Sequence, residues 1–208
     1  MSVIPTMRDR FCDGEVEVTV DMLRELHRTG PGGMIIANLR QTLYRVTHAR
    51  HLYTEARSLV PIYGHGDLLH DLVCCGEDWE ELADAATDHT WDQLDHWTEF
   101  SMRMNPLFRR LRGSMTLHRM DLNRRPRYGH TLDGARRVED TYVLRNDPRV
   151  TFTACCVQRH QDSLLVSLDM HAEGHFVTTW TQRVTHTTPP RFVSEMPLRA
   201  QLHLDHLT

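Results

Sequence analysis

Hydrophobic residues recur every three or four positions in the first half of the chain and every second position in the second half. The three- and four-residue spacing between residues 36 and 60 predicts a long helix that ends before Pro61. Shorter helices are expected at 21–28, before the Gly-Pro-Gly-Gly run at 30–33, and at 67–75 and 77–88. A further helix is expected from Thr90 to the proline at 106, and a short strand at 15–20.

Strict alternation of apolar and polar residues begins near residue 150. It continues through segments joined by short, turn-like connections at 145–148, 159–162 and 171–174, which predicts an antiparallel meander of three or four strands built mainly from residues 140–187. The alternation places the following side chains toward the helices or a partner sheet: Val150, Phe152, Leu164, Val166, Leu168, Phe176 and Trp180.

Helices followed by strands indicate an α+β protein, with an N-terminal helical layer packed on a C-terminal antiparallel β-meander. The expected organisation is a mainly helical region at 1–112, an Arg-rich connector at 113–139 and an antiparallel sheet at 140–208. A single integrated domain is equally consistent with the same pattern.

The composition is that of an ordinary globular protein, with 40% apolar and 25% charged residues in 208 positions. No apolar run reaches the roughly 18 residues of a membrane span, so no membrane partner is expected. The five cysteines form an odd set with two adjacent pairs, which is typical of reduced thiols rather than a disulfide framework. These features predict a cytoplasmic protein, present also in the nucleus if it acts inside a host cell.

Lysine is absent, because all 24 basic residues other than histidine are arginines. This excludes chemistry that needs a lysine, including the phosphate-binding lysine of P-loop proteins and Schiff-base catalysis. GC-rich coding or an overlapping reading frame would replace lysine with arginine, and a protein in a foreign cell would escape ubiquitin attachment. Both explanations favour a virus, a phage or a GC-rich microbe as the source.

Ten arginines and only two acidic residues lie between residues 103 and 137, a formal charge of +8 in a chain whose net charge is −4. Arginine binds phosphate through a planar fork, and aromatic rings can stack on bases. We therefore expect a non-enzymatic binding protein without a cofactor, whose partner is RNA or an acidic host protein. The expected contacts are Arg109, Arg110, Arg112, Arg119, Arg124, Arg125 and Arg127, with Tyr128 stacking on a base.

Two alternatives for this segment remain open. The segment 123–130 is expected to be an exposed loop that reaches a partner on one face of the molecule. Alternatively, Arg109, Arg110 and Arg112 pair with the acidic helices around residues 77–88 and stabilise the fold. An exposed edge of the predicted sheet also favours a homodimer.

A histidine- and aspartate-rich segment suggests a different function. The string Leu68-Leu69-His70-Asp71-Leu72, with His48 about two dozen residues earlier, resembles the metal-dependent HD phosphohydrolases. The resemblance covers about 25 residues and implies His48, His70 and Asp71 as ligands of a divalent metal that activates water. The family's later aspartate has no clear counterpart, because Asp88, Asp92 and Asp95 are equally suitable. The alternative function is therefore a metal-dependent phosphohydrolase.

Overall fold

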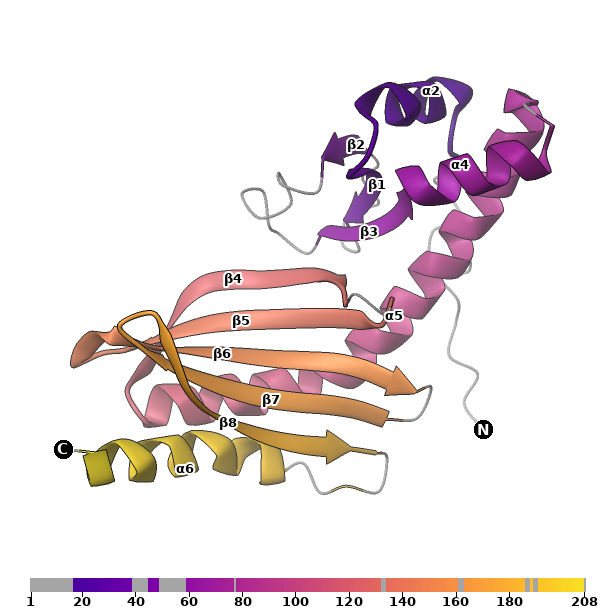
Figure 1. The fold of residues 1–208 in the computed structure, drawn as a ribbon. Coiled ribbons are helices and arrows are strands. Elements are labelled where there is room, and N and C mark those ends of the chain that lie inside the picture. Colours follow the sequence, from indigo (N-terminus) through magenta and orange to yellow (C-terminus); the bar gives the residue numbers. More distant parts are fainter. Residues whose placement is uncertain are drawn as a thin grey trace. The chain divides into compact units, whose positions relative to one another are not determined.

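The computed structural model describes residues 17–38, 45–48, 59–76, 78–131, 134–160, 163–185, 188 and 191–207. The chain forms two compact units, Met1–Glu99 and Phe100–Thr208, and helix α5 (Trp79–Leu117) contributes residues to both. Each unit contains an antiparallel sheet and helices, so the predicted α+β class is confirmed (Figure 1).

The first unit begins with helix α2 (Val20–Thr29), which the sequence predicted within a residue at each end. The Thr19 side chain accepts a hydrogen bond from the Met22 amide, and Gly30 ends the helix at a positive φ of 73°. Three strands follow, β1 (Gly33–Asn38), β2 (Arg45–His48) and β3 (Leu59–Gly64), in the antiparallel order β2-β1-β3.

Helix α4 (His65–Cys74) follows β3 directly, and α5 begins at Trp79. The Asp67 carboxylate accepts a hydrogen bond from the Gly64 amide, and Asp78 accepts bonds from the first amides of α5, so both helices have capped N-termini. The indole Nε1 of the fully buried Trp97 donates to the Pro61 carbonyl at 3.1 Å. This bond fixes the first part of α5 to strand β3.

The second unit contains a five-stranded antiparallel meander in the order β4-β5-β6-β7-β8. Its strands are β4 (Met120–His130), β5 (Arg136–Leu144), β6 (Asp147–His160), β7 (Ser163–Ala172) and β8 (His175–Val184). Helix α6 (Arg191–Leu207) follows the last strand. The meander predicted from alternation is therefore confirmed, with one further strand, β4, before it.

The second part of α5 and helix α6 cover one face of this sheet (Figure 1). The Ser114 hydroxyl of α5 donates to the Ser194 carbonyl of α6 at 2.6 Å, and the rings of Trp180 in β8 and His203 in α6 contact edge to face. The core beneath the helices includes the predicted side chains Val150, Phe152, Leu164, Val166 and Leu168, all buried. Phe176 was also predicted to be buried, but it is 61% exposed on the edge strand.

The predicted helix over residues 36–60 is wrong. Ile36 lies in β1, Val46 in β2 and Val60 in β3, while residues 39–44 and 49–58 lie outside the described part of the chain. Buried strands carry apolar residues on both faces, so their spacing imitates a helical period. The strand expected at 15–20 is also wrong in its described part, because residues 17–19 are not in a strand and α2 begins at Val20.

The helix end predicted at Pro106 is wrong. Helix α5 is continuous from Trp79 to Leu117 and contains Pro106, and α6, which was not predicted, contains Pro197. An interior proline removes one helical hydrogen bond and costs roughly 3 kcal/mol. The apolar face of α5 on both sides of Pro106 buries Met104, Phe108 and Leu111, and this burial outweighs the loss.

The segment 123–130 is not the expected loop, because it belongs to strand β4. Strand β4 is the edge of the sheet, and its pairing with β5 is irregular between Leu122 and Arg127. Pro126 and several arginines stand at this irregular stretch, as is typical of edge strands, where proline and charge prevent further pairing.

Candidate nucleic-acid interface

The two units carry opposite formal charges. The unit Phe100–Thr208 contains 16 arginines and 10 acidic residues, a formal charge of +6, whereas Met1–Glu99 contains 8 arginines and 18 acidic residues, a formal charge of −10. The positive charge of the second unit comes from its segment 103–137, which carries +8, whereas the rest of that unit carries −2. An anionic partner would be attracted to that unit and repelled by the first.

Most acidic side chains described in the second unit are already paired with an arginine. The pairs are Arg112–Asp140, Arg127–Glu139, Arg137–Glu139, Arg145–Asp121, Arg149–Asp147, Arg149–Glu173 and Arg199–Glu195. These carboxylates leave little negative charge to compensate the remaining arginines. The surplus charge of the unit therefore resides on arginines outside these pairs.

Arg109 and Arg110 are two such arginines, and they lie on the solvent-exposed face of α5. Both side chains are exposed, and neither has an ion-pair or hydrogen-bond partner among the described residues. Since a helix turns by about 100° per residue, the exposed Gly113, Thr116 and Leu117 belong to the same face. We call this set of residues the α5 outer face. Its described part carries no acidic side chain.

Gly113, Thr116 and Leu117 of this face were not predicted from the sequence, and the unusual residue among them is Gly113. It lies inside a continuous helix, where glycine is less favourable than alanine by about 0.5–1 kcal/mol. A Cβ atom added at Gly113 would meet no atom within 4 Å, so no described neighbour requires a glycine at this position. The sequence feature that could have identified Gly113 is a glycine inside an Arg-rich segment whose apolar residues recur at helical spacing.

Arg112 lies at the border of this face, about 60° around the helix from Arg109, and its partly exposed side chain binds a strand of the same unit. Its guanidinium binds both carboxylate oxygens of the fully buried Asp140, with Nε 2.7 Å from Oδ2. Burial lowers the pKa of Arg112, but the hydrogen bond and charge of Asp140 outweigh this effect and raise the pKa overall. The alternative that these arginines form ion pairs within the fold is therefore correct for Arg112. Its partner, however, is an aspartate of strand β5 rather than an acidic residue of the helices around residues 77–88.

Arg127 and Arg137 lie on the sheet face that α5 and α6 do not cover. The register pairs Arg127 with Glu139 and Glu139 with Cys155, so these three side chains form one row across the strands. Glu139 binds both arginines, with Arg127 at 3.8 Å and Arg137 closer. Burial raises the pKa of the Cys155 thiol, although the charge of Arg137 opposes this shift. The row is a polar network within the sheet rather than a group of unpaired cations.

The remaining predicted contacts are distributed differently. Arg119 is exposed in the turn between α5 and β4 at a φ of 60°, and its carbonyl accepts a hydrogen bond from the Arg145 amide. Tyr128 is half-buried and pairs with the core residue Val138, which puts it on the helix-covered face of the sheet. Arg124 and Arg125 belong to β4, but their side chains lie outside the described residues.

The arginines predicted to form one face are therefore divided between two surfaces. The α5 outer face points away from the sheet, whereas Arg127 and Arg137 occupy the opposite face of that sheet. This division depends on strand register and helix rotation. A one-residue change in either would move each side chain to another face.

The alternative metal ligands are not brought together. His48 lies in β2, His70 on the exposed side of α4, and Asp71 accepts a hydrogen bond from the Tyr63 hydroxyl at 2.7 Å. In the part of the chain that the structure describes, no three histidine, cysteine or acidic side chains form a group that could hold a metal ion. The residues that carry the resemblance to the HD phosphohydrolases therefore do not form that family's site here.

No protein family, curated protein or solved structure matches this chain. Within the described ranges, no helix combines the length and the apolar character that crossing a membrane requires.

Proposed function

We propose that this protein is a non-enzymatic RNA-binding protein whose second unit contacts the phosphate backbone through the α5 outer face. The observation that carries the proposal is the pair of exposed arginines, Arg109 and Arg110, in a unit whose described acidic residues are mostly bound to other arginines. Unpaired guanidinium groups on a helix can bind phosphate oxygens without first breaking an internal ion pair.

RNA is favoured over an acidic protein surface by the composition of this face. Protein interfaces bury a central cluster of aromatic or aliphatic anchors, whereas the described α5 outer face offers only Leu117 as a large apolar side chain. Gly113 has no side chain, so a phosphate backbone can approach the helix closely at this position and contact the neighbouring arginines. The acidic first unit confines this contact to the second unit.

The absence of lysine supports a viral or phage accessory protein as the source. Arginine alone supplies the positive charge of the second unit, so the charge is permanent at all physiological pH values. A chain without lysine also offers no side-chain amine for ubiquitin attachment in a host cell.

The test is a fluorescence anisotropy titration of labelled single-stranded and double-stranded RNA at two salt concentrations, about 50 and 200 mM. The variant Arg109→Ala/Arg110→Ala should weaken binding about ten-fold and reduce the slope of log affinity against log salt by about 1.5–2. The matched control is Arg145→Ala/Arg149→Ala, which removes the same charge from the same unit but at exposed arginines that are already paired. It should change the affinity much less.

Three results would contradict the proposal. The first is a wild-type protein with no affinity for either RNA at low salt. The second is an equal loss of affinity in both double variants, which would indicate a response to net charge alone. The third is equal affinity for a polyglutamate chain of similar charge, which would favour an acidic protein as the partner instead.

A further inference from the structure

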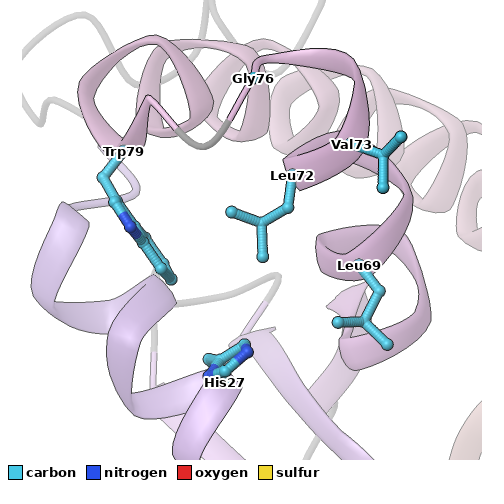
Figure 2. A pocket seen from close by; sticks show the side chains of 6 residues that line it. All are labelled: His27, Leu69, Leu72, Val73, Gly76 and Trp79. Carbon is cyan, nitrogen blue, oxygen red and sulfur yellow. The ribbon is translucent and has the colours of Figure 1, made fainter.

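The first unit contains an open pocket between α2, α4 and the start of α5, with a volume of about 770 Å³. It is lined by His27, Leu69, Leu72, Val73, Gly76 and Trp79. Figure 2 shows that Trp79, Leu72 and His27 point toward a common space from three different helices. The pocket is independent of the α5 outer face in the second unit.

Helix α4 exposes apolar side chains on the side that borders this pocket. Leu68 faces the core and is fully buried, but Leu69 is 46% exposed and Val73, one turn later, is 83% exposed. Residues four positions apart are neighbours on a helix, so Leu69 and Val73 form one apolar surface. A group of apolar side chains at the mouth of an apolar pocket is typical of a surface that a partner covers.

The extent of this surface favours a polypeptide over a small ligand. In Figure 2 Val73 points away from the space between Trp79 and His27, so a small molecule held in that space would leave Val73 in water. A helix laid along α4 would cover Leu69 and Val73 and insert a side chain beside Trp79. This is the arrangement of an amphipathic helix bound in a hydrophobic groove.

The polar groups at the pocket are basic or aromatic. The Arg24 guanidinium carbon lies 5.8 Å from the centre of the Trp79 ring, and His27 contacts the same ring edge to face at 6.1 Å. The centres of the His65 and His27 rings lie 6.2 Å apart. These contacts place the Arg24 guanidinium and the imidazole rings of His27 and His65 close to the Trp79 side of the pocket.

Three of the nearby acidic side chains already accept hydrogen bonds. Asp67 caps α4 and Asp71 binds the Tyr63 hydroxyl, while Asp78 accepts the first amides of α5. On α2, Asp21 and Glu25 lie about 120° and 160° around the helix from His27, whereas Asp21 lies about 60° from Arg24. None of the described lining residues is acidic. Arg24, beside the Trp79 ring, is therefore the side chain on this side of the pocket that can bind a negatively charged group.

We propose that this pocket binds a short amphipathic helix of a partner protein. Apolar side chains of that helix would cover Leu69 and Val73 and fill the space beside Trp79. An acidic side chain next to them would bind Arg24, whose guanidinium already lies against the Trp79 ring.

The experiment selects peptides of random sequence displayed on phage against the full chain, with the variant Leu69→Ser/Val73→Ser as the counter-target. Both replaced side chains are exposed, so the variant should fold, and circular dichroism checks this. The matched control is Leu198→Ser/Leu202→Ser, which removes two half-exposed apolar side chains from α6 in the other unit. Selected peptides should carry apolar residues three or four positions apart with an adjacent Asp or Glu.

The selected peptides are then synthesised and titrated by fluorescence polarisation. The Leu69→Ser/Val73→Ser variant should lose at least about ten-fold in affinity, and the α6 control should bind like the wild type. Arg24→Gln should weaken binding several-fold, and replacing the peptide's acidic residue by its amide should have no further effect in that variant. Failure to enrich any peptide, peptides that bind the α4 variant equally well, or peptides without an acidic residue would overturn the proposal.

Discussion

Arg112 and Asp140 form a bidentate ion pair between helix α5 and strand β5, with nitrogen–oxygen distances of 2.7 and 3.1 Å. The Asp140 side chain is fully buried, and the Tyr142 hydroxyl donates a third hydrogen bond to it at 3.0 Å. Both oxygens of the buried carboxylate are thus satisfied. The pair joins helix and sheet within the second unit, so Arg112 belongs to the fold rather than to a binding surface.

Replacing Arg112 by alanine should destabilise the second unit by about 2–3 kcal/mol. The change would leave a buried carboxylate with the Tyr142 hydroxyl as its remaining donor, and such uncompensated charges are strongly unfavourable. The Arg112 side chain is 41% exposed, which keeps the expected loss below that of a fully buried pair. Urea unfolding should show a lower midpoint with an unchanged m-value.

The control for this prediction is Arg145→Ala, which breaks the exposed ion pair with Asp121. Its effect on the free energy of unfolding should be much smaller, because the exposed Asp121 carboxylate that loses its partner is solvated by water. Equal losses in the two variants would contradict a special contribution from the buried pair.

The second half of the fold could be predicted from the sequence because its strands alternate cleanly. Phe152 and Val166 face the core, while their neighbours Thr153 and Ser167 face the other side of the sheet. Alternation of this kind fixes both the strand and its buried face. The edge strand β4 was missed because an edge strand needs little apolar alternation and tolerates Pro126 and charged residues.

The first half could be predicted only in part. The helices α2 and α4 have caps and glycine boundaries that the sequence shows, whereas β1 and β3 are short, buried and rich in β-branched residues such as Ile35 and Ile36. Local spacing does not separate such strands from a buried helix. The candidate site was predicted by residue type, but only the rotation of α5 shows that Arg110 faces water and Arg112 faces Asp140.

Two of the five tyrosines should not ionise near pH 10 while the protein is folded. Burial raises the pKa of Tyr63 and of Tyr142 well above the ordinary value of 10.0, and the carboxylates of Asp71 and Asp140 raise them further. Because the folded pKa is the higher one, this contribution to stability is complete below about pH 10 and decreases as the pH rises above it.

The measurement is an alkaline titration followed by the ultraviolet absorbance of tyrosinate and, in parallel, by circular dichroism. Two tyrosines should ionise only together with unfolding, and Tyr63→Phe should remove one of them. Ionisation of all five near pH 10 in a chain that is still folded would show that the two rings are not protected as described.

The cysteines should separate into reactive and protected thiols. Cys74 is exposed, whereas Cys155 and Cys156 are buried on opposite faces of β6, and burial raises the pKa of both buried thiols. The thiolate is the nucleophile, so burial and a raised pKa should both slow the reaction of Cys155 and Cys156, whereas Cys74 is open to the reagent. In a Cys12→Ser background, an aromatic disulfide reagent should modify Cys74 rapidly and the β6 pair only after denaturant is added.

The same assay on Cys74→Ser provides the control. Burial together with the charges of Glu81 and Asp71 raises the pKa of Cys75, so Cys75 should react more slowly than its neighbour. The variant should therefore lose the fast phase. Rapid modification of Cys155 or Cys156 in the native protein would contradict their burial.

Gly113→Ala should stabilise the protein and weaken its binding to RNA at the same time. Alanine favours an exposed helix interior by up to about 1 kcal/mol, and the added Cβ meets no described atom within 4 Å. If a phosphate backbone lies against this position, the methyl group would hold it away from Arg109 and Arg110. Urea unfolding should show a higher midpoint, and the RNA titration a several-fold lower affinity.

The opposite signs of these two effects distinguish a binding surface from a merely solvated helix. The matched control is Gly66→Ala in α4, where an added Cβ also meets no described atom within 4 Å but which lies in the acidic first unit. That variant should leave the RNA affinity unchanged. A Gly113→Ala protein that is more stable and binds RNA as tightly as the wild type would show that the partner does not approach the α5 outer face at this residue.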